Sequence, residues 1–97
     1  MPETRFALFH SPGPQWRHDM PPFEQVGLHD HVTYFRLLHE AGKLAFGGPF
    51  VDAASGGMMV LAADVGEEEA TTIANDDPAV RGGLLAVRVR AWRQIFE

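Results

Sequence analysis

Apolar side chains recur at helical spacing between Leu28 and Gly42. Read at about 100° per residue, this segment predicts a helix with one apolar and one polar side. The apolar side consists of Leu28, Val32, Phe35 and Leu38, and the polar side of His29, Thr33, Arg36, Glu40 and Lys43. His31 falls on the apolar side, one turn before Phe35, so an ionisable ring is directed at the predicted core. Gly42 is expected to end the helix, because glycine readily adopts the left-handed conformation found at helix C-termini.

Stretches that are apolar, or that alternate between apolar and polar residues, predict four β-strands. They span residues 5–10, 44–51, 58–63 and 84–95. In the first of them, Phe6, Leu8 and His10 share one face. The loop from Pro12 to Pro22 contains four prolines and is expected to be long and irregular. Residues 52–57 predict the turn of a hairpin that joins the second and third strands.

A second helix is predicted to start at Gly66 and to end at Asp76-Asp77-Pro78. Glycine is an acceptable N-cap, and the three glutamates that follow it suit the positive end of the helix dipole. The helix ends because the residue before a proline is driven away from helical backbone angles. A short turn through residues 81–83 then leads to the last strand.

The order strand, helix, strand, strand, helix, strand predicts an α+β protein with the ferredoxin-like βαββαβ arrangement. Its sheet is antiparallel, and both helices lie on one face. The first and third strands are apolar on both sides, as Leu8 beside Phe9 and Met58 beside Met59 illustrate. Monomers rarely leave an apolar sheet face uncovered, so we expect a homodimer that packs open sheet face against open sheet face.

Length and composition narrow the possible functions. The 97 residues are expected to form a single domain, residues 1–97. The absence of cysteine excludes disulfides, thiolate zinc sites and a cysteine nucleophile. The net charge of −5 argues against nucleic-acid binding. No stretch approaches the roughly 20 apolar residues of a membrane span, and no signal peptide is evident, so a cytoplasmic protein is expected.

Several short motifs, in their order and spacing, resemble the YciI-like (YCII-related) family of small dimeric α+β-barrel proteins. They are His31 in His-Val-Thr-Tyr-Phe, Leu38-His39-Glu40-Ala41-Gly42, Gly48-Pro49 and Asp77-Pro78-Ala79-Val80. The resemblance implies a ferredoxin-like protomer, a dimeric α+β barrel and an active-site cleft built around a histidine and an aspartate, which correspond to His31 and Asp77. It extends from about residue 28 to the C-terminus, and the first strand fits as well.

Related α+β-barrel proteins include isomerases, dehydrochlorinases and cofactor-free oxygenases that act on small ring compounds. The chain departs from the family at Leu28, where an arginine is often found three positions before the histidine. Its proline-rich loop departs from the family pattern as well. Because of these two departures, the resemblance does not determine the substrate or which residue, if any, binds an anionic group of it.

His31 and Asp77 are the predicted catalytic pair. A neutral imidazole can accept a proton near neutral pH, and a carboxylate on its other nitrogen fixes the tautomer and stabilises the imidazolium. The structural alternative is a buried histidine whose carboxylate partner ties the two helices together. A metal site is not expected, because His29 and His31 point about 200° apart on a helix.

His10, Ser11, Gly48, Pro49 and Pro78 are predicted to bind the substrate, although a solvent-facing strand end is the favoured interpretation of His10. Trp16 is a candidate cavity wall, and Trp92 is expected at the dimer contact.

The predicted function is a cofactor-independent enzyme that uses His31 and Asp77 for proton abstraction, isomerisation or elimination on a small ring-type metabolite. The alternative is a non-catalytic dimer module that binds a small molecule or serves as an accessory protein. No cofactor is expected.

Overall fold

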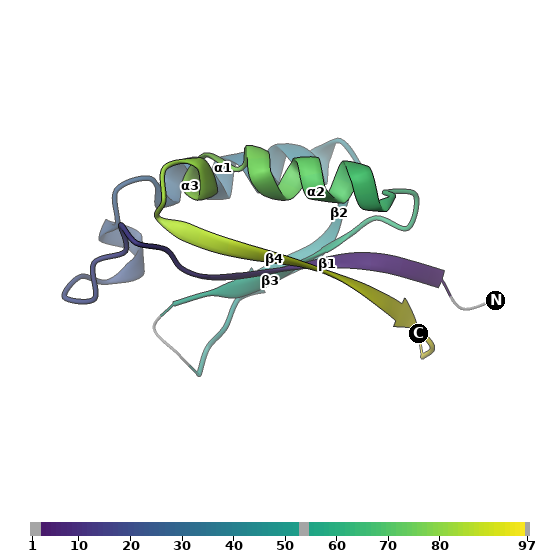
Figure 1. Cartoon of the computed structure of the whole chain (residues 1–97), viewed down its shortest axis with the longest axis horizontal. Helices are drawn as coiled ribbons and strands as arrows, with labels where there is room; N and C mark the ends of the chain where they lie inside the picture. Colours follow the sequence, from purple (N-terminus) through teal and green to yellow (C-terminus); the bar gives the residue numbers. More distant parts are fainter. Residues whose placement is uncertain (1–2, 53–54, 97) are drawn as a thin grey trace.

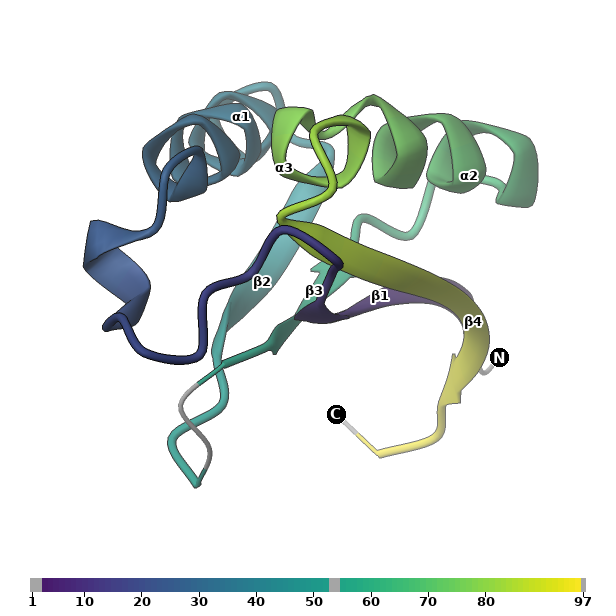
Figure 2. The same cartoon turned by 60° about the vertical axis from the view of Figure 1, so that its left-hand side comes forward.

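A four-stranded antiparallel sheet, with its helices on one face, makes up the fold (Figures 1 and 2). The computed structural model describes residues 3–52 and 55–96. Its elements are β1 (Glu3–Pro12), the 3-10 helix η1 (Pro22–Glu24), α1 (Leu28–Glu40), β2 (Leu44–Pro49), β3 (Gly57–Leu61), α2 (Glu67–Asp76), α3 (Pro78–Arg81) and β4 (Leu85–Gln94). No helix of this described part is long and apolar enough to cross a membrane.

The strand order is β2-β3-β1-β4, and every neighbouring pair is antiparallel. β1 and β4 pair along their whole length, from Glu3 opposite Gln94 to Pro12 opposite Leu85. All three α-helices cover the same sheet face, as Figure 2 shows. This is the ferredoxin-like α+β fold, and the predicted fold class is confirmed.

The core lies between the helices and the sheet. Leu8 of β1 and Leu61 of β3 are fully buried there against Phe35 of α1 and Ile73 of α2. Phe6, Leu8 and His10 lie on one face of β1, as predicted, and this face points to the helices. Burial of each large apolar side chain stabilises the folded state by about 1.5–3 kcal/mol. This packing fixes α1 above the sheet.

Several element boundaries differ from the sequence prediction. β1 continues through Ser11 and Pro12, which pair with Ala86 and Leu85, because the long partner strand β4 extends the ladder. β2 ends at Pro49, and β3 spans Gly57–Leu61 instead of residues 58–63. The predicted hairpin turn includes residues 53–54, which lie outside the described residues.

The helical predictions need two corrections. Val32 was assigned to the buried side of α1 but is 44% exposed. After α2, the chain forms the extra short helix α3, where only a turn was expected. The cause is local, since Asp77 caps this helix and Pro78 occupies its first position, where a missing N–H costs nothing.

Gly66 and Gly42 lie at the ends of α2 and α1 as predicted, and Gly42 has a φ of 78°.

The loop between β1 and α1 is held in place at both of its ends. The N–H of Gly13 donates to the carbonyl of Leu84, and a methyl group at Gly13 would collide with the carbonyl oxygen of Gly83. Further along, the buried Gln25 amide donates to the carbonyls of Arg17 and Met20. The loop is therefore a fixed wall beside the start of α1.

Candidate functional site

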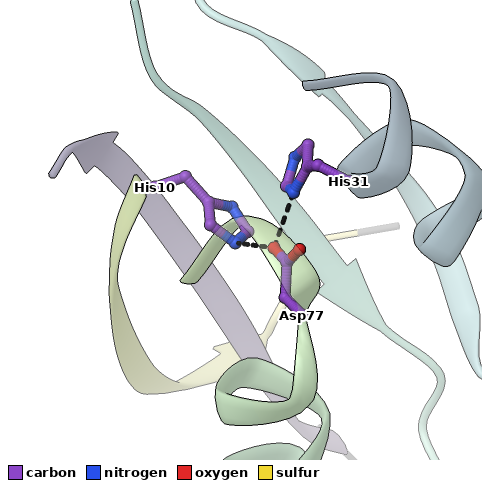
Figure 3. Close-up of side chains that lie close together, drawn as sticks. All are labelled: His10, His31 and Asp77. Carbon is purple, nitrogen blue, oxygen red and sulfur yellow. Dashed lines mark hydrogen bonds and ion pairs between the residues drawn. The ribbon is translucent and has the colours of Figure 1, made fainter. Parts of the chain in front are cut away.

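Three polar side chains meet in the interior below the first turn of α1 (Figure 3). His10 comes from β1, His31 from α1 and Asp77 from the junction of α2 and α3. They are 4%, 7% and 0% exposed, respectively. Buried ionisable groups are costly unless they are paired, so their mutual contacts decide whether the cluster is stable.

Asp77 is fixed by its place in the backbone. Its φ of −58° and ψ of 123° interrupt the helical path, and its Oδ1 accepts a hydrogen bond of 2.9 Å from the N–H of Ala79. Pro78 follows in the first turn of α3 and restricts the junction further. One carboxylate oxygen is thus used for capping, and Oδ2 is left to face the two imidazoles.

His31 makes the strongest contact of the cluster. Its Nδ1 lies 2.6 Å from Asp77 Oδ2. The ionised carboxylate can only accept, so Nδ1 carries the proton and donates. The ring is held edge-on against Phe35, with 5.1 Å between the ring centroids. Nε2 makes no hydrogen bond within residues 3–52 and 55–96, and its lone pair is available to a ligand.

His10 approaches the same carboxylate oxygen from the sheet. Its Nε2 lies 3.5 Å from Asp77 Oδ2, a distance at the outer limit of a hydrogen bond. Neither ring nitrogen has a hydrogen-bond partner in the described part of the chain. The ring stands edge-on to His31, 4.8 Å between centroids. The favoured prediction of a solvent-facing strand end was wrong, because β1 runs on past His10 and α1 covers the ring.

The two histidines change the ionisation of Asp77. Burial by itself raises the pKa of this carboxyl group, but the interactions with His10 and His31, the charge of His31 and the N–H of Ala79 together outweigh burial and lower the pKa to about 2. Asp77 is therefore an anion across the physiological pH range and remains a hydrogen-bond acceptor for His31.

A cavity of about 700 Å³ adjoins the cluster between α1, the β2–β3 hairpin and the loop that contains η1. We call it the His31 cavity. Its walls are mainly apolar, with two imidazoles at one end. Its apolar lining includes Trp16, Phe23, Leu28, Val32, Phe35, Phe46, Phe50 and Met59. Phe23 and Phe46 are largely exposed at its rim, so the cavity opens to the outside.

The predicted substrate-binding residues separate into two groups. His10, Gly48 and Pro49 line the His31 cavity. Ser11 and Pro78 are exposed and are not among the residues that line it. The binding role of each stays a prediction. Trp16 lines the cavity as expected, and Trp92 lies on the open sheet face.

The cluster could also be considered as a metal centre. One ligand atom each from His10, His31 and Asp77 lies within 4.8 Å of the other two. However, two ligands at about 2.0–2.1 Å from a tetrahedral zinc ion lie roughly 3.3 Å apart. The separation of 2.6 Å between His31 Nδ1 and Asp77 Oδ2 is that of a hydrogen bond. Helical spacing compares only histidines of one helix, such as His29 and His31, so it could not predict this cluster of residues from three separate elements.

Two comparisons with known proteins bear on this chain. The family model of the YCII-related domain matches residues 5–93. The uncharacterized protein YjpA of Bacillus subtilis (strain 168) is 34% identical over 71 residues, which cover 73% of this chain and 81% of YjpA. The chain belongs to the YCII-related family.

Proposed function

We propose that this member of the YCII-related family is a cofactor-independent enzyme that uses His31 and Asp77 for acid–base chemistry on a small ring-type metabolite. The observation that carries the proposal is the 2.6 Å contact between His31 Nδ1 and Asp77 Oδ2, beside a cavity that His31 itself lines. This contact leaves the unprotonated Nε2 as the proton acceptor.

The reaction would begin when His31 Nε2 takes a proton from a C–H bond of the bound substrate. Asp77 stabilises the imidazolium that forms, because its negative charge is already in place and needs no reorganisation. Return of the proton to another atom gives an isomerisation, and departure of a leaving group gives an elimination. General base catalysis of this kind contributes about 10²–10⁴ in rate.

The size and lining of the His31 cavity support a small-molecule substrate. Its volume of about 700 Å³ falls within the ordinary range for ligand sites. Apolar and aromatic walls favour a ring compound. A module that binds a ligand without turnover is the alternative, and measurements of turnover distinguish it from an enzyme.

An activated probe tests the base without knowledge of the natural substrate. In nitrobenzisoxazole, a base removes the proton from the C–H bond of the heterocycle. The C–H electron pair then forms a nitrile, and the N–O bond breaks to release a coloured phenolate. We expect the wild-type protein to catalyse this elimination, and His31→Gln to lower the rate by about 10²-fold or more.

The matched control is His39→Gln, which removes an exposed imidazole that also lines the cavity but has no carboxylate partner among the described residues. It should retain the wild-type rate. Circular dichroism spectra must show that both variants are folded. Equal rates for the wild type and a folded His31→Gln variant would contradict the proposal.

The proposal includes a homodimer formed through the open sheet face. A hollow on this face is lined by side chains that include Ala7, Phe9, Met58 and Trp92, and Trp92 is 44% exposed there. We expect Trp92→Glu to give a monomer in light scattering coupled to gel filtration, because a buried unpaired carboxylate is costly. Val26→Glu places the same charge at an exposed residue elsewhere and should leave the dimer intact. A wild-type protein that is monomeric in the same measurement would refute the proposed homodimer.

A further inference from the structure

We propose that the ligand of the His31 cavity is a ring compound with a carboxylate group, and that Arg36 binds this carboxylate at the mouth of the cavity. The inference rests on the proposed function, since it assumes that the reacting part of the ligand lies against His31. It adds the charge of the substrate class and a residue that selects for it.

The first observation is the distribution of charge. The chain has 13 acidic residues and a net charge of −5. None of the acidic residues in the described ranges lines the His31 cavity, whereas Arg36 and three of the five histidines do. The carboxylate of Asp77, which lies against both imidazoles of the cluster, is fully buried. The lining of the His31 cavity thus includes an arginine and, among the described residues, no carboxylate, although the protein as a whole is acidic, which favours an anionic ligand.

The second observation is the state of Arg36. Its side chain is exposed on α1, one turn after Val32, and both residues line the cavity. It forms no ion pair with a carboxylate in the part of the chain that the structure describes, not even with Glu40 one turn further along. Its guanidinium group is therefore available to bind a carboxylate through two parallel hydrogen bonds.

The third observation is spacing. Arg36 follows His31 by five residues, which corresponds to about 7.5 Å along the helix axis and about 140° around it, and both side chains line the cavity. A benzene-sized ring with a carboxylate at one end and a small reacting group at the other spans roughly this axial distance, and the long Arg36 side chain would bend across the cavity mouth to meet the carboxylate. The apolar wall between the two residues, to which Val32 and Phe46 contribute, would contact the ring.

Two probes of the same shape test the inference. They are p-toluate, which has a carboxylate on an apolar ring, and its neutral amide, p-toluamide. Isothermal titration calorimetry should show that the wild-type protein binds p-toluate about tenfold more tightly than the amide, since hydrogen bonds to charged groups exceed neutral ones by this order. Added salt should reduce the affinity for the acid and leave that for the amide unchanged.

Arg36→Gln should abolish the preference for the acid. Arg93→Gln is the matched control, because it removes one exposed arginine of β4 that does not line the cavity, and it should behave as the wild type. Equal affinity of the wild type for both probes, no binding of either probe, or an unchanged preference in Arg36→Gln would each overturn the inference.

The result can be separated from the proposed function with His31→Gln. If the acid–base role fails but this inference holds, p-toluate still binds preferentially to the wild type, while the nitrobenzisoxazole rate is the same with and without His31. If only this inference fails, the rate still depends on His31 and the preference for the acid is absent.

Discussion

Replacement of Asp77 by Asn is the most direct test of the energetics of the cluster. The substitution keeps the size of the side chain and the capping oxygen but removes the charge that faces His10 and His31. The pKa of Asp77 is lowered from 3.8 to about 2. Each pKa unit corresponds to 1.36 kcal/mol, so the ionised carboxylate contributes about 2 kcal/mol to the free energy of unfolding.

The sign of the pH dependence follows from the direction of this shift. Because the pKa of Asp77 is lower in the folded state, its contribution is complete above the unfolded value of 3.8 and is lost as the pH falls toward about 2. The wild type should therefore exceed Asp77→Asn in stability by about 2 kcal/mol at pH values near 5 and above. The difference should shrink toward zero in strong acid.

Urea unfolding followed by circular dichroism, repeated over a pH series, measures this difference. Asp76→Asn is the matched control, since the neighbouring Asp76 is exposed and makes no hydrogen bond to either histidine. It should leave stability nearly unchanged at every pH. If Asp77→Asn were as stable as the wild type at neutral pH, or if the difference persisted undiminished in strong acid, the assigned role of the charge would be wrong.

Two further comparisons of variants follow from the contacts. His31→Leu should cost about 3 kcal/mol in urea unfolding, because it leaves the buried Asp77 without its closest partner. His10→Leu should leave the free energy of unfolding unchanged or raise it, since neither nitrogen of His10 is hydrogen-bonded and leucine leaves no buried polar group unsatisfied. Gly13→Ala should destabilise by more than about 1 kcal/mol through collision with a carbonyl, whereas Gly48→Ala, with open space around the added methyl, should be nearly neutral in thermal unfolding.

The sequence was sufficient to predict those parts of the site that depend on local geometry. Helical periodicity places His31 on the same side of α1 as Phe35, and both residues are buried. The Asp-Pro pair ends α2 and makes Asp77 a rigid junction residue. The pairing of His31 with Asp77, which are 46 positions apart, was expected from the family resemblance and not from local geometry. The strand order also followed from the alternation of elements, because short connections leave few arrangements of βαββαβ.

What the sequence did not predict depends on contacts between distant segments. The burial of His10 results from the length of the β1–β4 ladder and from the cover that α1 provides. The cavity wall combines Phe23 of η1 with Phe46 of β2, two side chains that a local pattern gives no reason to place together. Gln25 shows no periodic signal either, yet its amide fixes the loop through three hydrogen bonds.

His10 occupies a position where an apolar residue would give a more stable protein. It follows Leu8 on the core face of β1, where an apolar side chain would pack against Phe35 without loss. Instead, two buried nitrogens remain without hydrogen bonds, a condition that costs about 1–3 kcal/mol per unsatisfied group. Such departures from local consistency are expected at functional sites. The Nε2 of His10 faces the carboxylate of Asp77, which also binds His31, and His10 lines the adjoining cavity. We therefore expect that His10 is retained for the chemistry of His31 and Asp77 or for binding the ligand, and not for stability.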